Sequence, residues 1–325
     1  MEAETQRVPV VREADQWEPS YLALHRSGEL RRRARAAMAA LAHCELCPHR
    51  CGVDRLANKL GVCRVGATPV IASWSVHHWE EPPISGTRGS GTIFFSGCTG
   101  RCRFCQNYSI SQLAHGNQVT IERFAGMMLE LQRRGVHNIN FVTPTHFVPQ
   151  ILAAVSLAAE WGLRIPLVYN TSGYEQVGTL RLLDGVIDVY LPDMKYADDA
   201  VARRLSGFPK YVTHNQAAVR EMHRQVGSSL QCDEDGIARR GMVIRHLVLP
   251  EGLAGTAGIM RWIAAELSPE VYVSVMDQYF PTYRAVDDPV LGRKITGEEY
   301  DAALAAFEAA GLTNGWLQDH DCQDD

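Results

Sequence analysis

The chain has 325 residues, with 32 Lys and Arg against 37 Asp and Glu, a net charge of −5 and 46% hydrophobic residues. This composition is typical of a globular protein and excludes a disordered or collagen-like chain. The acidic balance disfavours nucleic-acid binding over the whole surface and leaves one basic cluster, at Arg31, Arg32, Arg33 and Arg35. No apolar stretch of about 18 residues appears, and the first residues do not resemble a secretion signal. We therefore expect a cytoplasmic protein without a membrane segment.

The predicted elements divide the chain into four parts. Residues 1–43 form an N-terminal helical extension, residues 44–90 a Cys-rich metal-binding module without long periodic segments, and residues 286–325 a C-terminal helix and tail. In residues 91–285, apolar runs alternate with helical patterns and start near residues 92, 138, 164, 186, 242 and 270. This alternation predicts parallel strands joined by helices. The expected fold is α/β, a partial (β/α)6 TIM-type barrel with a small N-terminal four-cysteine metal module.

The nine cysteines are unevenly spaced, and a cytoplasmic chain keeps thiols reduced and available to metals. One group lies in the Cys-rich module and contains Cys44, Cys47, Cys51 and Cys63. Four thiolates can close a tetrahedral site completely, which suits a structural or electron-carrying metal. Zinc and a second [4Fe-4S] cluster both fit this ligand set, and the softness of the ligands favours the cluster.

A second group, Cys98, Cys102 and Cys105, follows the first predicted strand directly. That position is the carboxyl edge of the barrel, where barrel enzymes place their active sites. Three thiolates on one loop can hold three corners of an iron-sulfur cube and leave the fourth iron open to another ligand. The alternative is a zinc site completed by a histidine such as His115.

The segment GCTGRCRFCQN around this triad resembles the signature of the radical S-adenosylmethionine (SAM) superfamily, and its QN ending resembles the pyruvate formate-lyase activating enzyme branch. Further blocks, including CELCPHRCGVDR, EEPPISG, TPTHF, YNTSGYE, PDMKY and VIRHLVLP, are similar in order to an activating-enzyme-like group over about residues 44 to 285. The resemblance implies a [4Fe-4S] cluster on the triad with SAM chelated to its open iron, and a flavodoxin- or ferredoxin-type electron donor. The cofactor then supplies a 5′-deoxyadenosyl radical that abstracts a hydrogen atom.

The resemblance and the positions after predicted strands also suggest residues that contact SAM. Phe104 matches an aromatic near the adenine, and Asp193 and Lys195 resemble the D-x-K element of activating enzymes. Where the superfamily often has Gly-Gly-Glu, this chain has FVTPTH. Arg245 is expected to face the barrel interior in place of His246, because neighbours in a strand point to opposite sides. The predicted SAM contacts are Phe104, Thr143, Asn170, Ser172, Asp193, Lys195, Arg245 and Gln278.

Four of these residues have a structural alternative. Phe104 could be a core aromatic, Thr143 part of a tight turn at Pro144, and Asp193 with Lys195 a surface ion pair. The resemblance also suggests that Glu80 or Glu81 approaches the site, although both could belong to a solvated loop.

Hydrogen abstraction from a small molecule, sugar or peptide is the leading functional hypothesis. One alternative is an activase that installs a glycyl radical on a partner enzyme, and another, of a different class, is a metal-ribbon module that binds nucleic acid. Epimerisation within the leading class needs a hydrogen donor, for which Cys232 is the candidate catalytic residue, in a loop expected to reach the barrel mouth. An incidental packed thiol is the alternative for Cys232, and Cys322 lies in an acidic tail.

Overall fold

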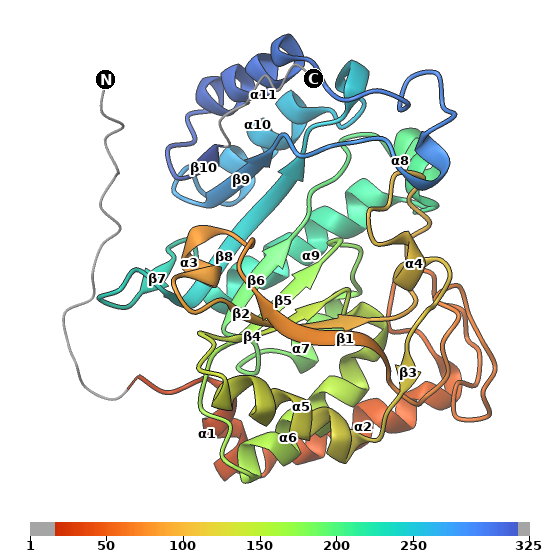
Figure 1. Cartoon of the computed structure of the whole chain (residues 1–325), viewed down its shortest axis with the longest axis vertical. Helices are drawn as coiled ribbons and strands as arrows, with labels where there is room; N and C mark the ends of the chain where they lie inside the picture. The colour runs from red at the N-terminus through yellow and green to blue at the C-terminus, as the bar shows by residue number, and fades with distance from the viewer. Residues whose placement is uncertain (1–16, 318–325) are drawn as a thin grey trace.

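The computed structural model describes residues 17–317 and contains a mostly parallel sheet with helices around it (Figure 1). The strand order is β10-β9-β8-β6-β5-β4-β2-β1-β3. Within residues 17–317, seven strands run parallel: β2 (Ser90–Phe95), β4 (Ile139–Val142), β5 (Leu167–Thr171), β6 (Val189–Pro192), β8 (Ala238–Leu247), β9 (Tyr272–Met276) and β10 (Gly315–Leu317). The first six are the predicted strands, so the expectation of an α/β fold with a parallel sheet is confirmed.

The two edges of the sheet carry strands that were not among the six predicted ones. β1 (Val70–His77) pairs antiparallel with β2, and β3 (Asn117–Gln118) pairs with β1, while β10 lies at the other edge. In the described part of the chain these two edges do not pair, so the barrel stays open.

The expectation that residues 44–90 lack a regular segment was wrong at β1. β1 pairs with β2 along one edge, and only some residues of β1 are buried, among them Ile71. The exposed Ser73 and Ser75 interrupt the apolar residues of β1, so a strand was not predicted from the sequence VIASWSVH.

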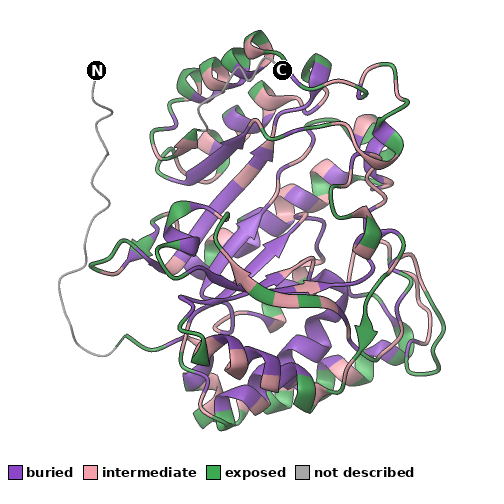
Figure 2. Cartoon of the chain, viewed as in Figure 1, coloured by how far each residue is buried: buried purple, intermediate pink, exposed green. Residues whose placement is uncertain are grey.

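Helices follow the strands and cover the outside of the sheet, with exposed residues on their outer faces (Figure 2). The α-helices that follow β3 in the described part of the chain are α5 (Ile121–Arg133), α6 (Val148–Glu160), α7 (Val177–Leu182), α8 (Asp199–Ser206), α9 (Tyr211–Val226), α10 (Thr256–Glu266) and α11 (Gly297–Ala309). Side-chain oxygens of Thr120 and Thr296 cap α5 and α11 at their first turns. In residues 17–317 no helix is long and apolar enough to cross a membrane.

The predicted N-terminal helices are α1 (Tyr21–Arg26) and α2 (Glu29–Ala39), and α2 packs against α6. The basic cluster on α2 is partly used within the molecule. Arg31 pairs with Glu160, and both Arg32 and Arg33 pair with Glu29. The alternative of a nucleic-acid-binding module therefore gains no support from this helix.

The amino end of the barrel is closed by the short helix α3 (Pro82–Ser85). Asn138, just before β4, donates a hydrogen bond to the Ile84 carbonyl, which ties α3 to that end of the sheet. Ile84 packs in an apolar cluster with inward residues of three strands, among them Val168, Val189 and Val243. This cluster fills the amino end and leaves the carboxyl end of the interior open.

Candidate active site at the carboxyl edge of the sheet

A cavity of about 460 Å³ lies at the carboxyl ends of the parallel strands. All three triad cysteines and all eight residues predicted to contact SAM line it: Cys98, Cys102, Cys105, Phe104, Thr143, Asn170, Ser172, Asp193, Lys195, Arg245 and Gln278. The carboxyl ends of parallel strands meet at one edge, so residues far apart in the chain converge here. The structure brings the predicted residues together, and the individual role of each stays a prediction.

The triad loop connects β2 to the short helix α4 (Tyr108–Ser111). All three thiols are free, and hydroxyls lie beside two of them: Ser206 Oγ donates to Cys102 Sγ at 3.0 Å, and Cys105 Sγ lies 3.1 Å from Ser111 Oγ. Burial, reinforced by the neighbouring thiols, raises the pKa of Cys98 to about 12. Such a thiol keeps its proton until a metal displaces it.

The triad fits an iron-sulfur cluster with one open iron, because its three cysteines line one cavity of about 460 Å³. Within residues 17–317 no group of three or more His, Cys, Asp or Glu side chains is arranged as ligands of a single metal ion. The fit to a cluster therefore rests on the free thiols and the cavity they share.

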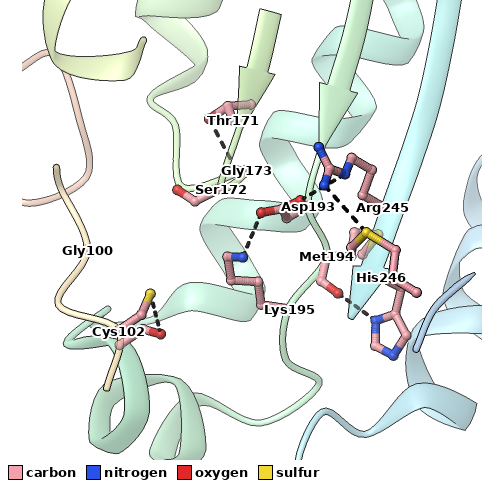
Figure 3. Close-up of polar contacts among 12 residues, drawn as sticks. Gly100, Cys102, Thr171, Ser172, Gly173, Asp193, Met194, Lys195, Arg245 and His246 are labelled. Atoms are coloured by element: carbon pink, nitrogen blue, oxygen red, sulfur yellow. Dashed lines mark hydrogen bonds and ion pairs between the residues drawn. The ribbon is translucent and has the colours of Figure 1, made fainter. Parts of the chain in front are cut away.

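Asp193, Lys195 and Arg245 form a charged network that lines the same cavity (Figure 3). Lys195 Nζ lies 2.6 Å from Asp193 Oδ2, and Arg245 lies 3.9 Å from Asp193 Oδ1. The side chains of Asp193 and Lys195 are only 17% and 18% exposed, so the alternative of a surface ion pair is wrong. Burial opposes the charge on Lys195, but Asp193 and the nearby Cys102 raise its pKa above the ordinary value.

Arg245 and His246 leave β8 on opposite sides, and Arg245 faces the cavity as predicted (Figure 3). His246 is fully buried outside the barrel interior, where Nδ1 lies 2.7 Å from the Met194 carbonyl and Nε2 lies 2.9 Å from Thr256 Oγ1. Burial lowers the pKa of His246 to about 4, so its ring is neutral at pH 7.

Glu80 and Glu81 both reach Arg245, from the loop that precedes α3. Glu80 Oε2 lies 3.4 Å from Arg245 Nη1, and Glu81 Oε1 lies 3.3 Å from Arg245 Nε. Burial raises the pKa of Glu80 to about 6, against the lowering effect of Arg245. Burial also opposes the charge on Arg245, but Glu81, Asp193 and Glu80 together raise its pKa. The alternative of a solvated loop is therefore wrong for both glutamates.

Thr143 adopts a backbone conformation that a β-branched residue rarely takes, with φ of 59°. Its N–H donates to the Asn170 carbonyl at 3.0 Å, which holds the turn against the end of β5. Thr143 lines the cavity, whereas the Thr145 hydroxyl turns into the protein and donates to Glu175 Oε1 at 2.5 Å. Strained residues held in this way are frequent at ligand sites.

Glu175 is a buried carboxyl group that the sequence analysis missed. It accepts hydrogen bonds from Thr145 and Thr171, and burial raises its pKa to about 7. It lies in YNTSGYE, five residues after Asn170, beyond the range in which strand alternation predicts direction. The only signal was a lone carboxylate in a segment that otherwise resembles a family block.

Phe104 lines the cavity and packs edge-on against Tyr279, with ring centroids 5.7 Å apart. Both interpretations of Phe104, as a core aromatic and as a SAM contact, agree with this position. Gln278 reaches the cavity rim, but the hydroxyl of Tyr279 is buried and donates to the Leu291 carbonyl at 2.6 Å.

Cys232 is not at the barrel mouth, and the prediction that its loop reaches over the mouth was wrong. The strand β7 (Gln231–Cys232) pairs with the first residues of β8, so Cys232 lies opposite Ala238 at the amino end. There its thiol packs in the apolar cluster of Ile84 and Val243. The position of Cys232 agrees with the alternative given above, an incidental packed thiol, and not with a hydrogen donor at the barrel mouth. Cys322 lies outside the described residues.

The four N-terminal cysteines come together at a second, smaller cavity. Cys44, Cys47, Cys51 and Cys63 line it with His146 and Arg55, and all four thiols are free. Cys44 and Cys63 are buried, whereas Cys47 and Cys51 are partly exposed. The chain therefore brings these four cysteines together at a cavity separate from that of the triad, and that they hold a metal, zinc or a cluster, stays a prediction.

Comparison with known proteins agrees with this geometry. A model of the radical SAM superfamily matches residues 92–226, which include the triad and the ends of β4, β5 and β6. The uncharacterized protein MJ0674 of Methanocaldococcus jannaschii is 32% identical over 279 residues, which cover 83% of this chain and 75% of that protein. The chain therefore belongs to the radical SAM superfamily. It is a radical SAM enzyme, and this domain implies a [4Fe-4S] cluster and SAM as cofactors.

Solved structures also show similarity in backbone arrangement. A radical SAM methyltransferase from Sphaerobacter thermophilus gives a TM-score of 0.47 at 13% identity, over 91% of each chain. HydG, a maturase of the [FeFe]-hydrogenase, gives a TM-score of 0.49 at 13% identity over 72% of this chain, which spans 53% of HydG. Methylornithine synthase (PylB) gives 0.44 at 13% identity, over 95% of this chain and 85% of that one.

Proposed function

We propose that this enzyme, as a member of the activating-enzyme-like group, abstracts a hydrogen atom from an unactivated C–H bond of a small molecule, sugar or peptide. The observation that carries the proposal is the cavity that the triad shares with the largely buried network of Asp193, Lys195 and Arg245. Its volume of about 460 Å³ lies in the range of small-ligand sites.

The bound cluster and SAM would supply a 5′-deoxyadenosyl radical, after one electron from a flavodoxin- or ferredoxin-type donor. The chain's own residues bind and orient these groups. Cys98, Cys102 and Cys105 would hold the cluster, and Phe104 would contact the adenine of SAM. Arg245 and Lys195 suit the carboxylate of SAM, and Asp193 suits its amino group. Hydrogen-bonding groups for the rest of the SAM molecule would come from Thr143, Asn170, Ser172 and Gln278.

Activation of a glycyl radical enzyme is the second candidate. One observation favours it: Trp79 lines the cavity and is 87% exposed, and an exposed indole is a side chain that protein partners often bury. A protein loop carrying the glycine would enter past Trp79. A small substrate needs no such contact.

The experiment begins with anaerobic reconstitution of the protein with iron and sulfide, followed by reduction in the presence of SAM. The wild-type protein should release 5′-deoxyadenosine, and the triple variant Cys98→Ala/Cys102→Ala/Cys105→Ala should release none, because it lacks the ligands of the cluster. Cleavage of SAM by the triple variant at the wild-type rate would disprove the mechanism.

Candidate substrates labelled with deuterium at carbon then test the substrate class. A true substrate transfers deuterium into 5′-deoxyadenosine, which mass spectrometry detects. The Trp79→Ala variant separates the two candidates, since loss of turnover on a partner protein with retained SAM cleavage favours the activase. Retained turnover on a small labelled substrate favours the leading proposal.

A further inference from the structure

The two cysteine loops are in direct contact, although they are separated in the chain. His49 lies between Cys47 and Cys51, and its Nε2 lies 2.8 Å from the carbonyl oxygen of Thr99. Thr99 lies between Cys98 and Cys102 in the triad loop. One hydrogen bond therefore joins the middle of one cysteine loop to the middle of the other.

A second contact joins Cys63 to the residue before the triad. A Cβ atom on Gly97 would lie 2.5 Å from the Cys63 carbonyl oxygen, so only glycine allows this approach, and its φ of 78° also favours glycine. Arg101 reinforces the contact, because its guanidinium donates both to the Val62 carbonyl and to the Cys98 carbonyl.

A third route runs through Arg55 and His146. The Arg55 side chain is 1% exposed, lies 3.8 Å from Cys44 Sγ and donates to the His146 carbonyl at 2.7 Å. The imidazole Nε2 of His146 lies 2.9 Å from the Ser96 carbonyl, two residues before Cys98. Three separate sets of contacts, each formed by only a few residues, thus link the two cysteine sites.

We propose that the four N-terminal cysteines hold a second [4Fe-4S] cluster that passes electrons to the cluster on the triad. A reduced flavodoxin or ferredoxin gives one electron to the second cluster, which gives one electron to the triad cluster and returns to its oxidised state. No bond forms or breaks in this transfer. The inference rests on the proposed function, since the triad cluster is the electron acceptor.

The surroundings of the four cysteines suit a group that changes charge. Reduction adds a negative charge, which the buried guanidinium of Arg55 beside Cys44 stabilises. The backbone N–H of Val62 points at Cys51 Sγ at 3.5 Å, and hydrogen bonds to cluster sulfurs raise the reduction potential. Partly exposed Cys47 and Cys51 leave one side of the site accessible to a donor protein.

The test compares the wild-type protein with the double variant Cys47→Ser/Cys51→Ser, and with Cys232→Ser as a matched control that removes a thiol outside both sites. Each [4Fe-4S] cluster holds four irons, so the wild type and the control should hold about eight per chain and the double variant about four. When both clusters of the wild type are reduced, electron paramagnetic resonance should show spin coupling between them. The double variant should lose this coupling and keep the triad signal that changes on SAM addition.

Reduction kinetics then test the direction of electron flow. Reduced flavodoxin should reduce the triad cluster at least tenfold more slowly in the double variant, whereas dithionite, which is small enough to enter the cavity, should support SAM cleavage in both proteins. Equal rates with flavodoxin, or zinc in place of iron at the N-terminal site, would overturn the relay. Loss of dithionite-driven SAM cleavage in the wild type would instead contradict the proposed function.

A second pair of variants keeps the test decisive if the double variant fails to fold. Arg55→Gln removes the buried positive charge and should lower the midpoint potential of the second cluster, while Arg55→Lys keeps the charge and should shift it less. The potential of the triad cluster should stay the same in both. An identical redox titration of the wild type and Arg55→Gln would count against a redox-active group at this site.

Discussion

The two ends of the barrel interior are built from the same strands but are filled in opposite ways. On β5, Val168 packs in the apolar cluster at the amino end, and Asn170 lines the cavity. On β8, Val243 likewise packs in the apolar cluster, and Arg245 lines the cavity. Residues two apart share one face of a strand, so the interior of β5 and β8 changes from apolar to polar within a single two-residue step. The barrel thus supplies stability at one end and ligand chemistry at the other.

This division makes the Arg245 network the most sensitive point of the charged end. Three carboxylates, Glu80, Glu81 and Asp193, lie within 4 Å of one guanidinium, and among the described residues only Asp193 has a second cation, Lys195, beside it. Buried ion pairs add little stability when intact, but removal of one partner leaves uncompensated charges in a poorly solvated place.

The largest effect is therefore expected for Arg245→Ala. It should lower the free energy of unfolding by roughly 3 to 5 kcal/mol and weaken SAM binding at least tenfold. Urea unfolding and SAM titration of the reconstituted protein measure the two effects. The control, Val243→Ala, lies on the same face and should cost on the order of 2 kcal/mol through its cavity while SAM affinity stays the same. Equal SAM affinities in the wild type and Arg245→Ala would place the SAM site elsewhere.

The alternation of side-chain direction along a strand sets how much of the molecule could be predicted from the sequence. The apolar runs identified the six central strands, and the alternation along β8 separated Arg245 from His246. Alternation fails once a strand has ended, so the buried position of Glu175 could not be predicted. The hairpin that contains Cys232 was misplaced, because nothing in SLQCDEDG specifies the end of the barrel to which a short edge strand pairs.

The buried carboxyl group of Glu175 should make the free energy of unfolding depend on pH, by an amount similar to the loss expected for Arg245→Ala. Its pKa is raised from the ordinary value of 4.5 to about 7 by burial, so the folded state disfavours the charged carboxylate. Its contribution to stability is complete below about pH 4.5 and is lost as the pH rises through 7. Relative to Glu175→Gln, the wild type should lose about 3 kcal/mol of unfolding free energy over this range.

Denaturant unfolding at a series of pH values from 5 to 8 measures this difference in the reconstituted proteins. Glu308→Gln, at an exposed glutamate of α11, is the matched control. A stability difference between the wild type and Glu175→Gln that is the same at every pH would show that the Glu175 carboxyl group does not change its charge in this range.

Asp193→Asn tests the charged end more gently, because the amide keeps the shape of the side chain and removes only its charge. Lys195 then loses the negative charge of its 2.6 Å partner, while Glu80 and Glu81 still pair with Arg245. A charge-assisted hydrogen bond is worth about 1.5 to 3 kcal/mol, so SAM affinity or cleavage should fall roughly tenfold. The absorption of the triad cluster should remain. Unchanged SAM titration and cleavage would remove Asp193 from the site.

Cys232→Ala should have the smallest effect, and it tests the apolar end of the comparison. The thiol is 7% exposed and packs beside Ile84, Val243 and Tyr272, so its removal should cost about 1 kcal/mol in unfolding free energy. Because the side chain lies at the amino end, the yield of 5′-deoxyadenosine and the deuterium that the product takes from deuterated water should match the wild type. A product that loses solvent deuterium only in Cys232→Ala would mean that the thiol donates hydrogen after all. The apolar cluster would then have to open during turnover, and the two ends of the barrel could no longer be assigned separate tasks.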